Sequence, residues 1–229
     1  MRIILFDIDG TLINSSGAGR RAIERAFAER HGLDGDLREI QFHGKADPAI
    51  IRDAFELKLG RSPSVAEIDE VIEGLLRHLP TELQNSPGYQ ILPGVSEILD
   101  ELHRRDDVVL GLETGNTERG AEMKLAHGGI WHYFRCGGYG SDSAVRTEIV
   151  RHGIRKAVEL AGPEEQIEEI WVVGDTPIDI EAGKAAGAKT LATATGMHDL
   201  ELLRESEPDL ALPNLSDVPL VTRTLLGTI

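Results

Sequence analysis

The sequence is poor in the features that would place it outside the cytoplasm. Cys136 is the only cysteine among 229 residues, so the chain cannot form an internal disulfide or a thiolate-rich zinc site. No apolar run approaches the ~18 residues that a membrane-spanning helix requires. The apolar start at residues 3–6 is too short for the hydrophobic part of a secretion signal. We therefore expect a cytoplasmic protein.

Positive charge is also scarce. The chain has 24 Lys and Arg against 39 Asp and Glu, which gives a formal net charge of −15. A protein that follows a nucleic-acid backbone needs clustered basic side chains, and so does one that binds an anionic membrane surface through charge. Neither partner is expected. If the substrate is an anion, a local positive charge must overcome the overall repulsion, and a bound divalent cation would provide it.

Short apolar runs predict the strands of a parallel sheet. They are too short for helices and rich in large apolar residues, which is typical of strands buried on both faces. Helical periodicity separates the runs, for example between Val150 and Ala161. The alternation predicts an α/β fold, a Rossmann-like doubly wound parallel sheet. The predicted strands are residues 3–6, 108–112, 170–173 and 190–192.

The segment from residue 16 to residue 86 shows helical patterns and no convincing strand. Asp47-Pro48 is typical of an N-cap followed by proline at the first helical position. The spacing of Ser64 and Glu67 fits a capping box, and an apolar stripe follows it. We therefore predict a core domain of residues 1–15 and 87–229. A helical cap domain of residues 16–86 would be inserted after the first strand.

Acidic and hydroxyl side chains follow three of the predicted strands. Asp7 and Asp9 follow the first, Thr114 the second and Asp175 the third, with Asp179 close behind. Ligands of open parallel sheets bind outside the carboxyl ends of the strands. Because magnesium prefers oxygen ligands, we expect Asp7 and Asp175 to share one Mg²⁺ ion. Asp7 would then attack a phosphoryl group, and Asp9 would donate a proton to the leaving oxygen.

The motifs around these residues resemble those of the haloacid dehalogenase superfamily. The likeness is closest to its phosphoglycolate-phosphatase-like members with an inserted helical cap, and it covers nearly the whole chain. It is carried by residues 7–12 (Asp-Ile-Asp-Gly-Thr-Leu), 112–116 (Leu-Glu-Thr-Gly-Asn) and 174–179 (Gly-Asp-Thr-Pro-Ile-Asp), with residues 208–218 in addition. The resemblance implies a magnesium-dependent phosphatase that forms an aspartyl-phosphate on Asp7.

The resemblance also implies a role for each residue of the site. Asp9 would be the general acid and then the base for the hydrolytic water. Magnesium would be held by the Asp7 side chain, the Asp9 backbone carbonyl and Asp175. Asp179 would orient either a metal-bound water or the phosphate-binding cation. The phosphoryl oxygens would be held by Thr114 and the backbone N–H of Gly115, with Asn116 beside them.

One position departs from the superfamily pattern. A lysine usually stands between the second and the last motif, but residues 141–148 read Ser-Asp-Ser-Ala-Val-Arg-Thr-Glu. We assign the role of the lysine to Arg146, just before the predicted helix around Val150. Arginine can hold phosphate through two nitrogen atoms. The other candidates lie further into the helix and are Arg151, Arg155 and Lys156.

Several residues also have simpler interpretations. Thr114 could cap the helix expected near Thr117, and Asp179 could be a first-turn acid favoured by the helix dipole. Lys45, in the predicted cap, has two interpretations: it could contact a second anionic group of the substrate, or it could be a solvated loop cation. Residues 17–22 match a dinucleotide fingerprint, but aspartates separate them from the strand. We interpret this segment as a hinge into the cap.

The expected function is hydrolysis of a small phosphomonoester, phosphoglycolate-like or sugar-phosphate-like, with Mg²⁺ as cofactor. A phosphomutase of the beta-phosphoglucomutase type uses the same intermediate and is the alternative. A dehalogenase has no leaving oxygen and so no need for Asp9. A phosphonate hydrolase would need a Schiff-base lysine in the cap. A non-catalytic binding module of the same fold would be expected to lack a motif acid, and none is missing.

Overall fold

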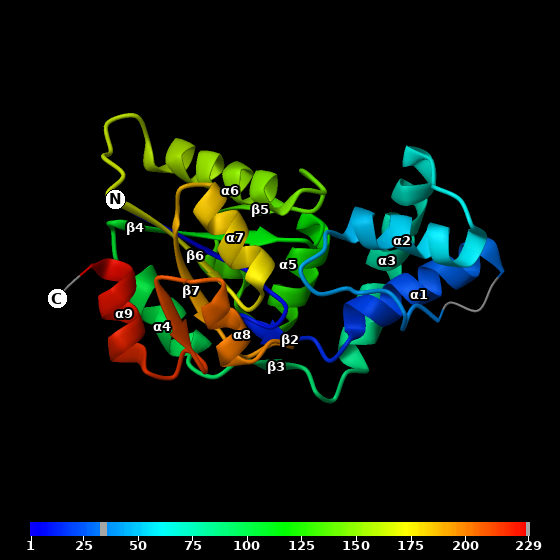
Figure 1. Ribbon diagram of the computed structural model, residues 1–229, viewed down its shortest axis with the longest axis horizontal. Coiled ribbons are helices and arrows are strands. Elements are labelled where there is room, and N and C mark those ends of the chain that lie inside the picture. Colours follow the sequence, from blue (N-terminus) through cyan, green and yellow to red (C-terminus); the bar gives the residue numbers. More distant parts are fainter. Residues whose placement is uncertain (33–35, 228–229) are drawn as a thin grey trace.

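A six-stranded parallel sheet forms the larger part of the molecule (Figure 1). The computed structural model describes residues 1–32 and 36–227. The strand order is β5-β4-β1-β6-β7-β8, and every neighbouring pair is parallel. The expected doubly wound α/β class is therefore confirmed. The strands are β1 (Arg2–Phe6), β4 (Val108–Thr114), β5 (Cys136–Tyr139), β6 (Glu169–Gly174), β7 (Lys189–Thr193) and β8 (Leu210–Leu212).

Helices cover both faces of the sheet, because alternate side chains of each central strand point to opposite sides. In β1, Ile4 and Phe6 join a cluster with α4 (Val95–His103), α5 (Glu118–His127) and α9 (Val218–Leu226). Ile3 and Leu5 join a second cluster on the other face. The helices of that face are α6 (Arg146–Ala161) and α7 (Pro177–Ala185), and the short α8 (Leu200–Glu205) packs beside β7.

All four predicted strands are present, as β1, β4, β6 and β7. Strand β5 was not predicted, because its sequence Cys-Gly-Gly-Tyr has no apolar run. Its glycines let α6 approach closely: a Cβ atom on Gly138 would lie 1.8 Å from the carbonyl oxygen of Ile149. The edge strand β8 is only partly buried and three residues long, so it too leaves little pattern in the sequence.

Three helices form a separate layer with its own hydrophobic cluster. They are α1 (Ala18–His31), α2 (Asp47–Leu59) and α3 (Val65–Gln84), and they lie together on one side of the sheet (Figure 1). At the centre of the cluster, Phe27 and Phe55 meet edge to face with ring centroids 5.3 Å apart. We call this layer the cap; its limits at residues 16 and 86 stay a prediction.

The two predicted helix starts of the cap have different outcomes. Ser64 and Glu67 form the expected capping box at the start of α3. The prediction that Asp47 is an N-cap is wrong: Ala46 is the N-cap of α2, and Asp47 is its first helical residue. The Asp47 carboxylate instead accepts a hydrogen bond from the backbone N–H of Thr117 at 3.0 Å. The Asp47 carboxylate therefore makes a tertiary hydrogen bond to the core domain, and not the local N-cap hydrogen bond that was expected.

A short pair of strands and the Arg21 side chain join the cap to the core. The strands β2 (Ile13–Asn14) and β3 (Gln90–Ile91) pair antiparallel beneath the entry and exit of the cap. Above them, the Arg21 guanidinium donates to the carbonyl of Ser16 at 2.6 Å and to the hydroxyl of Ser86. Arg21 also pairs with the buried Glu82 at 2.7 Å. One side chain thus ties both connecting segments to α3.

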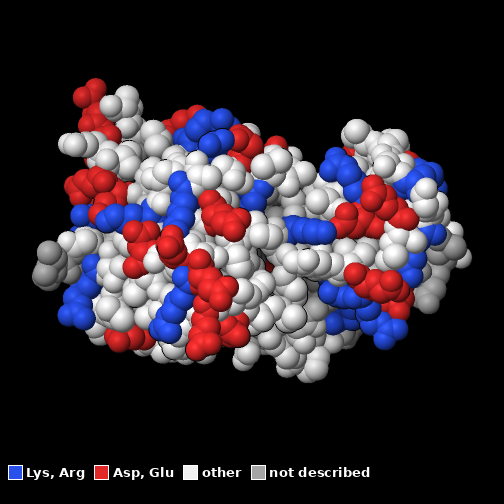
Figure 2. All heavy atoms as spheres, viewed as in Figure 1, with Lys and Arg blue, Asp and Glu red and all other residues white. Residues whose placement is uncertain are grey.

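Within residues 1–32 and 36–227, no helix is long and apolar enough to cross a membrane. Figure 2 shows Lys and Arg interspersed with Asp and Glu over both parts of the molecule. Basic side chains on this face lie beside acidic ones.

The ion pairs between α1 and α3 predict a difference in stability between two variants. Glu82→Gln should lower the free energy of unfolding by about 1–2 kcal/mol, because a buried carboxylate loses its charge opposite both Arg21 and Arg25. Urea unfolding followed by circular dichroism measures the loss. Glu70→Gln breaks a pair between the same helices, but Arg30 and Glu70 are 54% and 49% exposed. This control should lose less than about 0.5 kcal/mol, and equal losses would contradict the assignment.

Candidate active site

The register of the sheet brings the polar strand ends together. Phe6 of β1 lies opposite Leu112 of β4 and Val173 of β6. The residues at and just beyond these strand ends therefore lie side by side at the carboxyl edge of the sheet. Those residues include the predicted site positions Asp7, Thr114 and Asp175.

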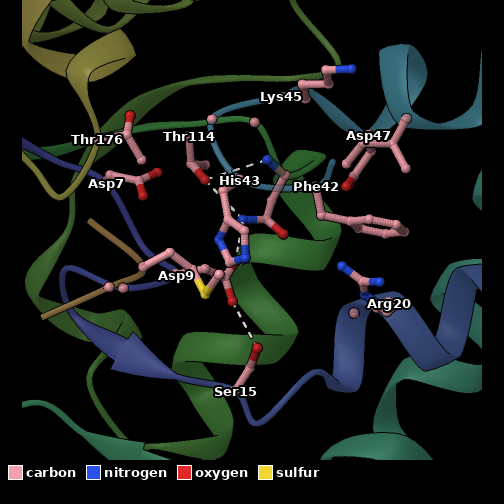
Figure 3. A pocket seen from close by; sticks show the side chains of 18 of the residues that line it. Asp7, Asp9, Ser15, Arg20, Phe42, His43, Lys45, Asp47, Thr114 and Thr176 are labelled. Atoms are coloured by element: carbon pink, nitrogen blue, oxygen red, sulfur yellow. Dashed lines mark hydrogen bonds between the residues drawn. The ribbon is translucent and has the colours of Figure 1, made fainter. Parts of the chain in front are cut away.

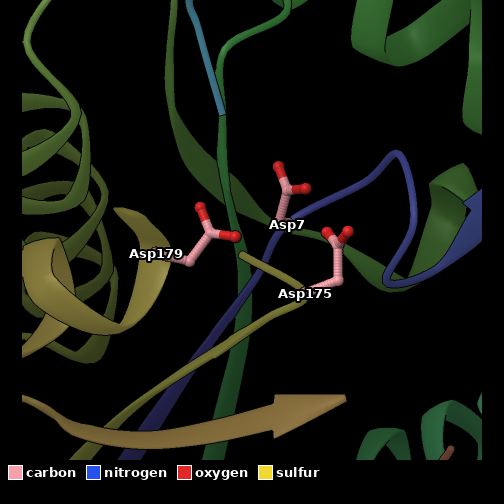
Figure 4. A group of neighbouring side chains, drawn as sticks. All are labelled: Asp7, Asp175 and Asp179. Carbon is pink, nitrogen blue, oxygen red and sulfur yellow. The ribbon is translucent and has the colours of Figure 1, made fainter. Parts of the chain in front are cut away.

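Asp7, Asp175 and Asp179 form a buried cluster of carboxylates (Figure 4). Each places one oxygen within 4.8 Å of the others. Asp179 serves two purposes, because its Oδ2 accepts hydrogen bonds from the N–H and hydroxyl of Thr176 in a capping box at the start of α7. Asp179 is thus a first-turn acid through its Oδ2, and its Oδ1 lies beside Arg146 in the site.

The cluster carries more negative charge than its surroundings neutralise. Burial raises the pKa of Asp7 to about 6, against the lowering effect of Arg146. Burial, together with the charges of Asp179 and Asp7, raises the pKa of Asp175 well above its usual range. A divalent cation among these oxygens would remove the imbalance, and all the donors are the hard oxygen ligands that such cations prefer. The residues present therefore fit a metal ion.

Arg146 is the cation of this cluster. It is the first residue of α6, and its Nη2 lies 2.7 Å from Asp7 Oδ1 and 2.7 Å from Asp179 Oδ1. Of the other candidates for the missing lysine, Arg151 pairs with Glu148 and Lys156 with Asp142 on the surface. Arg146 is thus the candidate that the fold brings to Asp7.

Glu113 was not predicted as a site residue. It is fully buried in β4, and its Oε2 lies 2.9 Å from Arg146 Nε. Burial raises the pKa of Glu113 well above its usual range, although Arg146 opposes this. A carboxylate behind the guanidinium fixes the plane in which Arg146 presents its other nitrogen atoms. An acid inside the apolar strand 108–114 was the sequence feature that could have indicated it.

The side chain of Asp9 lies apart from the carboxylate cluster. Its Oδ1 accepts from the Ser15 hydroxyl at 2.8 Å, and its Oδ2 accepts from Asn116 Nδ2 at 2.9 Å and Lys124 Nζ at 2.5 Å. Burial alone would raise the pKa of Asp9, but the Lys124 charge and the hydrogen bonds from Lys124, Asn116 and Ser15 outweigh it. The pKa of Asp9 is lowered, so the carboxyl is ionised at neutral pH.

Lys124 is the second residue that the sequence did not indicate. It is buried on α5 between Ala121 and Leu125, and its ammonium also donates to Asn116 Oδ1 at 2.6 Å. A lysine in a helix is normally interpreted as solvent-exposed. The feature that could have identified it is its position on the apolar face of that helix.

The segment after β4 holds the predicted phosphate contacts. Thr114 does not cap α5, whose N-cap is Thr117. Its hydroxyl oxygen accepts from the N–H and the Nδ2 of Asn116, at 3.3 and 2.8 Å, so its own proton can be donated to a ligand. Gly115 lies against the cap, where a Cβ atom would be 2.2 Å from the carbonyl oxygen of Lys45. These residues therefore lie where cap and core meet.

A cavity of about 410 Å³ opens between the sheet edge and the cap (Figure 3). One wall is the acidic site with Thr114, and the other comes from the cap and includes Arg20, Phe42 and His43. Lys45 also lines the cavity, but its ammonium pairs with Asp53 at 2.5 Å and points away from Asp9 in Figure 3. A contact between Lys45 and a substrate stays a prediction.

Fold and site together define an α/β protein with a capped, acidic centre that fits a metal ion. A family model described as haloacid dehalogenase-like hydrolase matches residues 4–193. The chain belongs to this family.

Relatives and solved structures agree with that membership. Pyrophosphatase PpaX of Oceanobacillus iheyensis is 27% identical over 95% of each chain. A phosphoglycolate phosphatase of Synechococcus elongatus is 29% identical, again over 95% of each chain. The crystal structure of CbbY from Rhodobacter sphaeroides in complex with phosphate covers 94% of this chain and 95% of its own, with a TM-score of 0.71 and 21% identity, and supports the fold. The predicted resemblance and the predicted class of enzyme, a hydrolase of the phosphatase kind, are confirmed.

The charge imbalance predicts opposite effects of one substitution without and with a metal ion. Asp175→Asn should stabilise the metal-free protein at pH 7 by about 1 kcal/mol, because a carboxyl whose pKa is raised on folding costs stability once it is ionised. The same variant should lose the stabilisation that Mg²⁺ gives the wild type, about 2.7 kcal/mol at 100 times the dissociation constant. Thermal unfolding with and without Mg²⁺ measures both effects.

Asp69→Asn is the matched control, since Asp69 is exposed on α3 far from the cluster. It should respond to Mg²⁺ as the wild type does. A metal response that persists undiminished in Asp175→Asn would show that the ion does not bind at the cluster.

Proposed function

We propose that the protein hydrolyses a small phosphomonoester with Mg²⁺ bound at Asp7, Asp175 and the Asp9 backbone carbonyl. The observation that carries this proposal is the buried set of carboxylates around Arg146, where both Asp7 and Arg146 line the capped cavity. Mg²⁺, when bound, would neutralise charge between Asp7 and the phosphoryl oxygens, so that an anion can approach an anion.

Asp7 is the proposed nucleophile. Its Oδ1 is held by Arg146 at 2.7 Å, and the residue directly follows β1 and lines the cavity. Attack on phosphorus forms an aspartyl-phosphate and breaks the bond to the leaving oxygen. Arg146 and the Thr114 hydroxyl would hold the phosphoryl oxygens, together with the N–H of Gly115. Asp179 would position Arg146, to which its Oδ1 lies 2.7 Å away.

Asp9 is the proposed acid and base. As the ionised partner of Lys124, its carboxylate can accept a proton from the water that cleaves the aspartyl-phosphate. In the first step the leaving oxygen needs a proton, and the Lys124 ammonium, 2.5 Å from Asp9 Oδ2, would supply one through the Asp9 carboxyl. Lys124 and Asn116 would thus hold the Asp9 carboxyl toward the leaving group.

The cap would exclude bulk water from the cavity and contact the leaving group. Its docking on the core is specific, because Asp47 N–H donates to Gly115 carbonyl at 2.8 Å, next to the bond from Thr117 to the Asp47 carboxylate. The cytoplasmic location expected from the sequence also stays a prediction. The oxygen-ligand set, the cap and the named relatives support a phosphatase acting on phosphoglycolate or a similar small ester.

The nucleophile assignment predicts the loss of all turnover in one variant. Asp7→Asn should lower Mg²⁺-dependent phosphate release from p-nitrophenyl phosphate at least about 1,000-fold, since the amide is not nucleophilic. Asp199→Asn, at the exposed N-cap of α8, is the control and should keep full activity. Activity retained in Asp7→Asn would refute the mechanism. With a sugar phosphate as substrate, an isomerised sugar without free phosphate would indicate the mutase instead.

The buried Lys124 predicts a selective effect on turnover. Lys124→Met should lower kcat about 10- to 100-fold and change KM less than about threefold, because Asp9 and Asn116 lose their common partner but the phosphate contacts remain. Steady-state kinetics with phosphate detection separates the two constants. Lys184→Met removes an exposed lysine that donates to the Ser206 carbonyl and should change neither. A rise in KM alone would place Lys124 in substrate binding instead.

A further inference from the structure

The cap wall of the cavity presents a cation that no carboxylate neutralises. Arg20 lies near the start of α1, lines the cavity, and holds its guanidinium 4.3 Å from the centre of the Phe42 ring. In Figure 3 the guanidinium points from α1 toward the cavity, beside Phe42. In the part of the chain that the structure describes, the Arg20 side chain has neither an ion pair nor a hydrogen bond.

The other cations around the cavity all have acidic partners. Lys45 pairs with Asp53, Lys124 with Asp9, and Arg146 with the carboxylate cluster. Among the described Lys and Arg residues that line the cavity, Arg20 therefore stands alone in having no counter-charge. In a protein of net charge −15, an unneutralised guanidinium inside a cavity is a local exception to a repulsive field.

The surroundings of Arg20 favour an anion over a neutral polar group. The contact with the Phe42 ring holds the guanidinium at the cavity wall, and a guanidinium without other partners can donate two parallel hydrogen bonds to a carboxylate or phosphate. Burial, followed by the nearby charges of Arg20 and His198, lowers the pKa of His43. His43 is therefore a neutral neighbour that can add a hydrogen bond. Ile23 and Ile50 complete an apolar wall. Apolar surroundings strengthen the attraction between the guanidinium and an anion.

We propose that Arg20, stacked on Phe42, binds a second anionic group carried by the leaving part of the phosphomonoester. This inference rests on the proposed function, since it defines the substrate class of the same cavity. The phosphoryl group would lie at Asp7 and Arg146, and the second anion would lie at the cap wall. Carboxylate and phosphate share the chemistry that Arg20 recognises, so the substrate class is a short phosphate ester with either group at its far end.

Three esters that share a phosphorylated CH2 group and differ in what it carries test the proposal. They are phosphoglycolate, which ends in a carboxylate, ethylene glycol bisphosphate, which ends in a second phosphate, and 2-hydroxyethyl phosphate, which ends in a neutral hydroxyl. Each is assayed with Mg²⁺ by phosphate release. The wild type should have a kcat/KM for at least one anionic ester about tenfold or more above that for the neutral ester.

Arg20→Gln should remove this preference. We expect it to lower kcat/KM for the preferred anionic ester about tenfold or more, mainly through KM, and to change the neutral ester less than about threefold. Arg20→Lys should retain part of the preference. Arg30→Gln, further along α1 and paired with Glu70 outside the cavity, should behave as the wild type. The larger of the two anionic effects identifies carboxylate or phosphate as the group that binds.

Two results would overturn the proposal: an equal loss on all three esters, or no change on any of them. Failure of the proposed function is a different result, namely no Mg²⁺-dependent phosphate release from any ester by the wild type. In that event binding still tests Arg20. Calorimetry with Asp7→Asn should give a dissociation constant for an anionic ester that rises about tenfold when Arg20→Gln is added, and an unchanged constant refutes the inference.

Discussion

The structure depends on one electrostatic constraint, the burial of several carboxylates around a single guanidinium. Asp7, Asp179 and Glu113 all lie within ion-pair distance of Arg146, and Asp175 is close by. Burying this much negative charge is unfavourable unless something compensates it. Arg146 compensates part of it, and the pKa values of Asp7 and Asp175 nevertheless stay raised by burial. A site of this kind is suited to a cation and, through it, to a phosphate.

Close packing of the surrounding residues holds these carboxylates in position. Strand β1 is buried on both faces, so Asp7 cannot move away from its neighbours without disturbing the clusters above and below it. Gly10 and Gly196 both pack directly on Asp175; Cβ atoms there would lie 2.4 and 1.7 Å from its Oδ2. The backbone thus closes around that carboxylate from two sides. Preorganisation of this kind lets charges act on a substrate without first rearranging.

Much of the site could be predicted because polar residues interrupt apolar runs. Asp7 and Asp175 stand out in the sequence for this reason. The parallel register of β1 and β6 then brings them together at one edge of the sheet. Glu113 also interrupts an apolar run, but its role, like that of Lys124, depends on partners far along the chain that the local sequence does not reveal. Asp47 shows the converse: its local pattern is that of an N-cap, but a tertiary hydrogen bond to Thr117 decides where its carboxylate lies.

One part of the contact between cap and core is made mainly by main-chain atoms. Around Gly115 and Thr117 the cap contributes the Lys45 carbonyl, the Asp47 N–H and a single carboxylate. The cap side chains that line the cavity, such as Phe42 and Ile50, take no part in these bonds. Mutations of the cap side chains that line the cavity can therefore accumulate without breaking these contacts. Substrate specificity can then change while the cap stays docked on the core.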